Sequence, residues 1–187
     1  DDPYRTFVEH GVTVIYMDNS VSLVGIMDDI EFLGEVVNKE DTAQSMTENM
    51  QASIDEIAAI GETITDKKTV YFELAPAPNI TTFGTGNFLN EIIELCGAEN
   101  VFSDEEGWIS PNAETIITKA PDVIITNVDY MDNQVDEIKE RDGWNTIPAV
   151  ANGEVYLVEA NASSRPTQNV VKAMNEIAKA IYPEYYN

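Results

Sequence analysis

The feature that most constrains the fold of this chain is a proline-free run of about forty residues, Val21–Ile64, with a helical rhythm of apolar side chains. Apolar residues at intervals of three and four mark one buried face of a helix. A break is expected at Asn38–Asp41, where polar residues interrupt this rhythm. The pattern fits an ordinary surface helix and a domain-bridging helix equally well. The positions expected on the buried face are Met27, Ile30, Leu33, Val36 and Val37, then Ala43, Met46, Met50, Ile54, Ile57 and Ile64.

Strands and helices alternate on both sides of this run. Before it, Pro3–His10 is interpreted as the end of a helix that stops at Gly11, and Val12–Met17 as a buried parallel strand. The alternation predicts the α/β class, a Rossmann-like lobe with a central parallel sheet flanked by helices and preceded by a long backbone helix. The strands expected after the run are Thr69–Leu74, Asn100–Phe102, Asp122–Thr126 and Gly153–Glu159, and the helices are Asn87–Cys96, Pro111–Lys119, Asn133–Glu140 and Arg165–Tyr182.

Charge and rare residues exclude several function classes. Lys and Arg number 10 against 34 Asp and Glu, so the net charge of −24 repels nucleic acid and anionic membrane surfaces. The single cysteine, Cys96, allows no internal disulfide or zinc cluster and is interpreted as a core thiol. His10, the only histidine, ends a helix and leaves no partner for a catalytic dyad or a histidine metal site. We therefore expect no catalytic residues, no metal and no cofactor.

Candidate ligand contacts lie in the loops that follow the predicted strands, because parallel strands end at one edge of their sheet. Trp108 follows an acidic loop and is interpreted equally well as a hinge-core residue or as a ligand platform. Arg165 either binds an anionic group of a ligand or pairs with a nearby carboxylate. Glu114 lies early in its helix, where the dipole favours a carboxylate, and is otherwise a solvated surface residue. These loops are Ala75–Gly86, Ser103–Ser110, Asn127–Asn133 and Ala160–Thr167.

Two rival functions use other residues. An α/β enzyme acting on a nucleotide or sugar would use Gly84 and Gly86 with the strand-end carboxylates Asp129 and Asp132, which can hold magnesium or perform acid–base chemistry. The two glycines are a weak phosphate motif, because the loop is long and the third glycine is missing. The second rival is an acidic surface adhesion module, which would bind proteins and be indifferent to metal chelates.

The order of these features resembles the metal-chelate class of ABC-transporter solute-binding proteins, which serve ferric siderophores, haem and cobalamin. The resemblance runs from about residue 12 to the end of the chain. Its most specific part is the run GNFLNEIIELCGAENVFSDEEGW, and it is supported by VIYMDN, VYFEL, APDVIITN and SSRPTQNVVKAMNEIAKAIYP. The resemblance implies two lobes joined by a rigid long helix, with a ligand held in the cleft between them.

The resemblance also implies how the chain is divided. Residues 1–20 would be a remnant of the N-terminal lobe, 21–66 a long interlobe helix, and 67–187 the C-terminal ligand-binding lobe. The N-terminal lobe would be largely absent, so that the chain is a C-terminal portion. The implied protein is not an enzyme, acts as a monomer and lies outside the cytoplasm, either periplasmic or lipid-anchored at the outer face of the cell membrane. Its signal segment would lie outside this chain.

Individual residues receive roles from the resemblance. Trp108 matches the aromatic residue that lines the cleft in cobalamin-binding members, and Arg165 a polar or basic contact at the start of the last helix. Phe83 and Thr81 lie in the loop that faces the ligand. Glu114 matches a carboxylate that docks into an arginine pocket of the ABC permease. By reasoning from the residues alone, haem held by a histidine of this lobe is disfavoured because His10 is distant in the sequence, although Tyr130 or Met131 could ligate its iron. The choice between cobalamin and an iron chelate stays open.

Overall fold

A four-stranded parallel sheet in the order β3–β1–β5–β6 lies at the centre of the structure, a computed structural model that describes residues 2–186. The strands are Glu99–Asn100 (β3), Thr69–Glu73 (β1), Val123–Thr126 (β5) and Val155–Leu157 (β6). In the register of β1 and β5, Val70 pairs with Val123 and Glu73 pairs with Thr126. The predicted central parallel sheet is therefore confirmed, and its strands are shorter than the sequence indicated.

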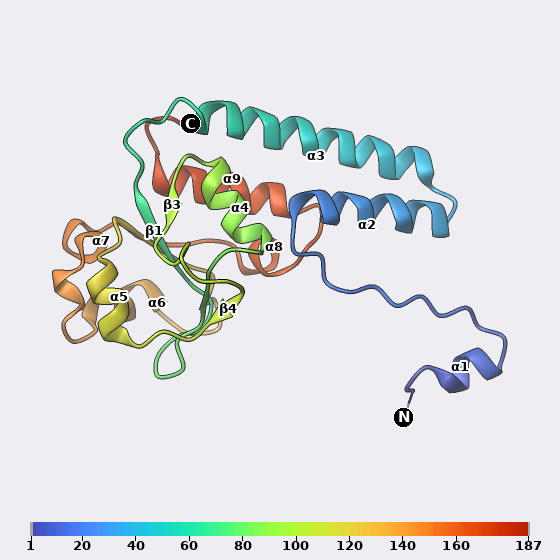
Figure 1. Cartoon of the computed structure of the whole chain (residues 1–187), viewed down its shortest axis with the longest axis horizontal. Helices are drawn as coiled ribbons and strands as arrows, with labels where there is room; N and C mark the ends of the chain where they lie inside the picture. Colours follow the sequence, from blue (N-terminus) through green and yellow to red (C-terminus); the bar gives the residue numbers. More distant parts are fainter. Residues whose placement is uncertain (1, 187) are drawn as a thin grey trace.

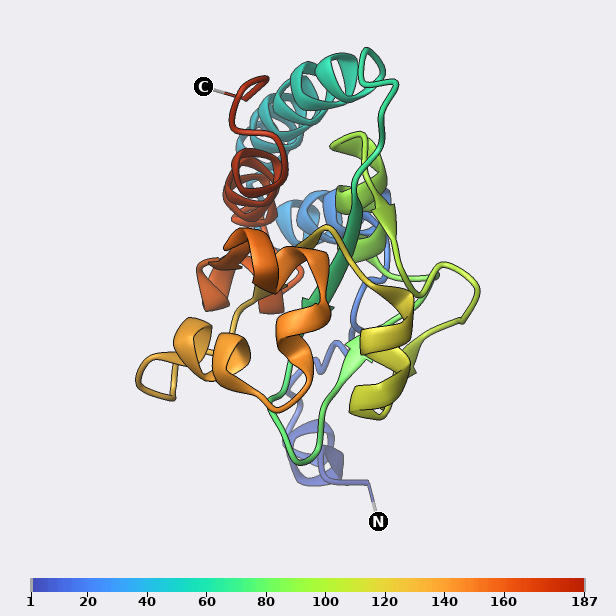
Figure 2. The same cartoon turned by 90° about the vertical axis from the view of Figure 1, so that its left-hand side faces the viewer.

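Helices cover both faces of this sheet (Figure 2). Alternate residues of β1 point into different cores, because successive side chains of a strand face opposite sides. Val70 and Phe72 pack with α4 and α9, whereas Tyr71 packs with α5, α6 and the segment after α6. The predicted layer arrangement of a Rossmann-like lobe is confirmed. The helices are Phe88–Leu95 (α4), Ala113–Lys119 (α5), Gln134–Glu140 (α6), Pro148–Asn152 (α7), Ala160–Ser164 (α8) and Val170–Ile181 (α9), with a 3-10 turn at Trp144–Thr146 (η1).

The run Val21–Ile64 forms two helices that lie side by side as an antiparallel hairpin, Leu23–Val36 (α2) and Glu40–Gly61 (α3), as Figure 1 shows. The predicted break is confirmed, because α2 and α3 are separated at residues 37–39. Asn38 adopts a left-handed conformation (φ 56°), which reverses the chain direction. Gly34 lets the helices meet closely, because a Cβ at this position would overlap the Ala43 side chain.

The buried face of the hairpin agrees with the prediction in α3 and differs in α2. Ala43, Met50, Ile54 and Ile57 are buried in α3, and Ile64 is buried just after it. In α2 the buried apolar residues are Leu23 and Ile26, whereas the predicted Leu33, Val36 and Val37 are exposed at the far end of the hairpin. That end extends past the sheet and the helices that cover it, as Figure 1 shows.

The predicted strand Val12–Met17 is not formed. The short helix α1 (Arg5–Glu9) and an extended segment run away from the body of the molecule, as Figure 1 shows. No other strand within residues 2–186 lies beside this segment, and a strand needs a neighbour for its backbone hydrogen bonds. Val12 and Tyr16 are consequently 50% and 72% exposed.

One local prediction near the sheet edge needs correction, and one feature there was not predicted. The last helix begins at Val170, and Arg165 instead ends the short helix α8. Pro166 explains this, because the residue before a proline is disfavoured in the helical conformation. The structure also contains an antiparallel pair of strands, Thr82–Phe83 (β2) and Trp108–Ile109 (β4). Each strand has two residues, which is too short to show an alternating pattern in the sequence. Within the described residues no helix is long and apolar enough to span a bilayer.

The long helix α3 is fastened to the lobe at its C-terminal end. Gly61 lies against the turn after α4, where a Cβ would overlap the carbonyl oxygen of Leu95. The hydroxyl of Tyr186 contacts the carbonyl oxygens of Ile57 at 3.2 Å and Cys96 at 3.0 Å. The hairpin is therefore rigidly attached to the sheet layers at this end.

Replacing Gly61 with alanine should test this attachment. We expect Gly61→Ala to lower the free energy of unfolding by about 2 to 3 kcal/mol, because the added methyl group overlaps backbone atoms. Urea denaturation measures the loss. Gly153→Ala is the matched control, since Gly153 has a positive φ but no heavy atom within 4 Å of an added Cβ. We expect the control to cost about 1 kcal/mol. An equal cost at both positions would contradict close packing at Gly61.

Candidate ligand pocket at the carboxyl edge of the sheet

A pocket of about 220 Å³ lies where the strands of the sheet end. Three of the four loops predicted to carry ligand contacts line it, together with a segment that leads into α2. The pocket has an apolar lining with a few amide and hydroxyl groups, which is the usual composition of a small-molecule site. Its lining residues are Asn19, Ser20, Val21, Leu74, Gly86, Asn87, Phe88, Leu89, Gly107, Trp108, Ser163, Ser164 and Pro166.

Trp108 forms an aromatic wall of this pocket. Its ring is 64% exposed and stands edge-to-face on Phe83, with 6.3 Å between the ring centroids and an interplanar angle of 89°. Phe83 is fully buried and packs in turn on Phe72 of β1, with centroids 5.5 Å apart. Trp108 therefore offers a large apolar surface to solvent while its position is fixed from below.

Three buried asparagines attach the strand under this wall to the rest of the lobe. The Nδ2 of Asn100 donates to the carbonyl oxygen of Phe83 at 3.0 Å and to Oδ1 of Asn90 at 3.1 Å. The Oδ1 of Asn100 accepts from the amide of Phe102 at 3.0 Å. Asn87 donates to the carbonyl oxygen of Gly84 at 3.1 Å and caps α4 by accepting from the Asn90 amide. Every polar group of the Asn100 side chain is satisfied, so the position of Phe83 is firmly specified.

Ser163 and Ser164 contribute hydroxyl groups to the lining of the pocket. Asn127, which follows β5, is buried and donates through Nδ2 to the hydroxyl oxygens of Ser163 and Ser164, both at 3.0 Å. Glu159 caps the short helix that carries these serines, because its carboxylate accepts from the amides of Asn161 and Ala162. Burial by itself would raise the pKa of Glu159, but the hydrogen bonds from Ala162 and Asn161, together with the charge of Lys172, lower this pKa overall.

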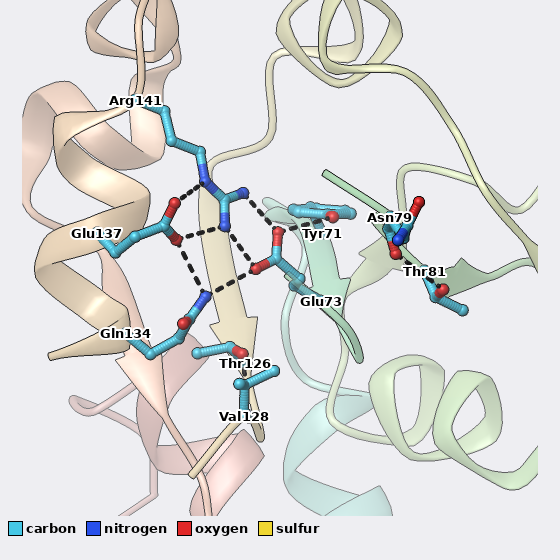
Figure 3. A network of polar contacts seen from close by, with 9 residues as sticks. All are labelled: Tyr71, Glu73, Asn79, Thr81, Thr126, Val128, Gln134, Glu137 and Arg141. Atoms are coloured by element: carbon cyan, nitrogen blue, oxygen red, sulfur yellow. Dashed lines mark hydrogen bonds and ion pairs between the residues drawn. The ribbon is translucent and has the colours of Figure 1, made fainter. Parts of the chain in front are cut away.

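A buried charged network lies at the same edge of the sheet, as Figure 3 shows. Glu73, the last residue of β1, is fully buried and receives two hydrogen bonds from the guanidinium of Arg141, at 2.6 and 2.9 Å. The same guanidinium donates to Glu137 of α6, and the Nε2 of Gln134 donates to both carboxylates. Trp144 lies against the guanidinium at 4.5 Å from its ring centroid. This Glu73–Arg141 network joins α6 to β1 and thereby anchors the end of the loop before α6.

The pKa values in the network reflect its burial. Burial raises the pKa of Tyr71, whose hydroxyl donates to Glu73, and the Glu73 charge raises it further against the opposing effect of Arg141. Burial by itself would lower the pKa of Arg141, but its hydrogen bonds to Glu73 and Glu137 raise it instead. Arg141 therefore stays charged at neutral pH.

The structure brings one predicted ligand residue, Trp108, directly into the pocket. Phe83 supports it from behind, and Arg165 is exposed beside the lining residue Pro166. Thr81 and Tyr130 lie in neighbouring loops outside the lining, with Tyr130 70% exposed. Glu114 is exposed in the first turn of α5.

Sequence reasoning missed the polar residues of the site. Asn87, Ser163 and Ser164 line the pocket, whereas Asn90 and Asn100 hold its wall. One usable signal was Asn100, a polar residue within a predicted buried strand, which needs hydrogen-bond partners.

The glycines and carboxylates that the alternative enzyme hypothesis relies on do not come together as a site. Gly84 packs against the backbone of Glu105, where a Cβ would overlap a carbonyl oxygen, so its small size serves the approach of β4 to β2. Asp129 and Asp132 are exposed in the loop after β5. Among residues 2–186, no group of three or more potential metal-ligating side chains is gathered.

Comparisons with known proteins agree with this geometry. The sequence profile of a family described as periplasmic binding protein matches residues 1–162. The chain is 28% identical over 187 residues to the uncharacterized ABC transporter substrate-binding lipoprotein YvrC of Bacillus subtilis, covering 99% of this chain and 59% of that protein. It is 28% identical over 171 residues to a vitamin B12-binding protein of Vibrio campbellii, covering 88% and 58%.

A solved structure shares the fold. It is described as a possible iron-binding (periplasmic solute-binding) protein from Staphylococcus epidermidis, and it is 27% identical with a TM-score of 0.85. The match covers 95% of this chain and 69% of that one. These relatives and neighbours are substrate-binding proteins of transport systems and not enzymes. The chain spans less than two thirds of the length of the two curated relatives.

The asparagine contacts predict the effect of a small change at residue 100. Asn100→Asp removes both donors and places a carboxylate oxygen against the Phe83 carbonyl and the Asn90 side chain. We expect the free energy of unfolding to fall by about 3 kcal/mol, and acrylamide quenching to show a more mobile Trp108. Asn112→Asp is the matched control, because Asn112 is an exposed N-cap at which aspartate also caps. A loss no larger than that of the control would contradict the assigned role of Asn100.

Proposed function

The chain belongs to the periplasmic binding protein family, and from that membership we propose that it forms most of the solute-binding component of an ABC importer, which captures a metal chelate in a cleft. The observation that carries this proposal is the pocket at the carboxyl edge of the sheet, with Trp108 as its aromatic wall. Phe83 and the asparagines hold that wall in place before any ligand arrives. Preformed walls reduce the entropy that binding costs.

We assign residues 67–187 to one ligand-binding lobe, 21–66 to the helical connection and 1–20 to the remnant of the other lobe. Two observations support this division. The chain covers 59% of its Bacillus subtilis relative. The segment of residues 12–17 is rich in β-branched residues and exposes apolar side chains on both of its faces, including Val12, Ile15 and Tyr16. A strand with two apolar faces belongs inside a sheet that helices cover.

The ligand that suits this aromatic, weakly charged wall is a weakly charged chelate, either cobalamin or a ferric siderophore of the hydroxamate type. The pocket is mainly apolar, no cationic side chain lines it within residues 2–186, and the exposed Arg165 precedes the lining residue Pro166. One cation in so acidic a protein is poorly matched to a triply charged catecholate chelate. Haem is a further candidate, with Tyr130 or Met131 as the exposed side chain that ligates iron. The relative named as a B12-binding protein supports the first choice.

Delivery requires a second partner, an ABC permease at the outer face of the membrane. Glu114 is exposed at the start of α5, where it is free to meet an arginine pocket of the permease. A carboxylate that meets arginines gives orientation, and a net charge of −24 accelerates approach to a basic surface. This function places the protein outside the cytoplasm, in the periplasm or lipid-anchored, as a monomer.

The ligand proposal is tested by removing the aromatic wall. Cyanocobalamin, haemin and a ferric hydroxamate siderophore are titrated by calorimetry into the protein at its natural length. We expect Trp108→Ala to weaken the binding of the accepted ligand about 10- to 100-fold, because an aromatic anchor is lost. Tyr185→Ala is the control, since Tyr185 is an exposed aromatic outside this pocket. Equal affinities for wild type and Trp108→Ala would contradict the pocket assignment.

The docking role of Glu114 predicts a separation of binding from transport. Glu114→Gln should leave ligand affinity within about twofold but weaken association with the reconstituted permease about tenfold. Uptake into proteoliposomes and ligand calorimetry measure the two properties. Glu140→Gln, on the exposed surface of α6, is the matched control. A loss of ligand affinity in Glu114→Gln, or normal uptake, would refute the docking role.

A further inference from the structure

The segment that leads into α2 forms one wall of the pocket. We call residues 18–22 the strap, and its residues Asn19, Ser20 and Val21 all line the pocket. The strap is tied to α2 by its own side chains. Ser22 accepts from the amide of Gly25 at 3.0 Å, and Ser20 donates to the carboxylate of Asp29. The strap therefore moves together with the first turn of α2.

One residue of the lobe holds this unit in place from outside. The Oε2 of Glu91, on α4, accepts from the backbone amide of Leu23 at 2.8 Å, across 68 residues of sequence. Leu23 is the first residue of α2, so its amide has no partner within the helix. The carboxylate meets the positive end of α2, where negative charge is favoured. This contact therefore joins α2 to α4 by a charge-assisted hydrogen bond.

The same turn of α4 also lines the pocket. Asn87, Phe88 and Leu89 are lining residues, and Glu91 follows them within the first turn of the helix. The contact that sets the position of the strap relative to α4 is thus made within the helical turn that follows these lining residues. Leu23 and Ile26 are buried in the core beneath and give the first turn of α2 a second attachment to the lobe.

The geometry points to Glu91 as a positioning residue that latches the strap across the pocket and so controls how long a ligand stays bound. With the latch made, the strap stands as a fixed wall beside α4. With it broken, the first turn of α2 frays and the strap moves away from the pocket. The latch itself stands on the contact with Leu23, whereas its effect on a ligand rests on the proposed function.

The latch is tested first without any ligand, by ¹⁵N NMR on the protein at its natural length. In Glu91→Ala we expect the Leu23 amide to exchange with deuterium about tenfold faster or more, as the loss of one charge-assisted hydrogen bond predicts. Backbone order parameters of the strap should fall towards about 0.6 from a rigid value near 0.85. Glu91→Gln keeps a neutral acceptor and should restore part of the protection. Unchanged Leu23 exchange and strap order in Glu91→Ala overturn the inference.

Two variants control for simpler explanations. Ser22→Ala removes the other cap of α2 and should accelerate exchange at Gly25 while leaving the Leu23 amide protected. Glu48→Ala removes one carboxylate from the exposed side of α3 and should change neither amide. Loss of Leu23 protection in Glu48→Ala would assign the effect to overall charge and overturn the latch.

Ligand release is measured second, by stopped-flow displacement of whichever of cyanocobalamin, haemin or ferric hydroxamate binds the wild type. Glu91→Ala should raise the dissociation rate about tenfold and leave the association rate within about threefold, because the strap is a wall and not an entrance. A mobile strap with an unchanged release rate refutes its control of the ligand. If none of the three probes binds the wild type, the proposed function fails, and the NMR comparison still decides whether Glu91 holds the strap.

Discussion

The buried carboxylate of Glu73 is the constraint around which the functional edge of the sheet is built. An unpaired charge at the end of β1 would be prohibitively costly, so the chain must bring a cation to it. Arg141, at the C-terminal end of α6, supplies this cation. Its guanidinium also donates to Glu137 and lies against the ring of Trp144. A buried ion pair adds little net stability, but the loss of one partner costs about 3 to 5 kcal/mol. Its main consequence is specificity, because it fixes α6 against β1 in one arrangement.

The pocket beside this network combines fixed and movable walls. Trp108 is held through Phe83 by the side chain of Asn100, whose hydrogen-bonding groups are all satisfied. The serines are held by hydrogen bonds from Asn127. The strap, by contrast, is held through the first turn of α2, by the Glu91 contact and by the buried Leu23 and Ile26, and it continues into an exposed segment (Figure 1). On the inference drawn for Glu91, ligand selectivity belongs to the lobe walls, whereas the lifetime of a complex depends on the strap. Local stability differs in this way wherever a binding site must also open.

The sequence predicted those parts of the fold that depend on local periodicity and on apolar burial. The strands Thr69–Leu74 and Asp122–Thr126 and the helix Asn87–Cys96 were placed within one or two residues. Features that depend on distant partners were not predictable. Val12–Met17 has every local property of a strand yet lacks a neighbour, and the pair β2–β4 is too short to show a pattern. Within the site, the aromatic Trp108 was recognisable by type. The amides were not, because asparagine in a sequence signals turns and caps more often than a buried chain of hydrogen bonds.

The surface of the chain is strongly acidic overall, yet its first residues expose many apolar side chains. A net charge of −24 keeps the molecule soluble and separate from other acidic surfaces. Yet Phe7, Val8, Val12, Ile15 and Tyr16 are all exposed within a dozen residues of sequence. So dense an apolar segment on so acidic a protein is the mark of a surface that another body covers. In the proposed two-lobe arrangement this segment would be buried in the other lobe. Because it leads directly into the strap, the other lobe would then adjoin the wall of the pocket that Asn19, Ser20 and Val21 form.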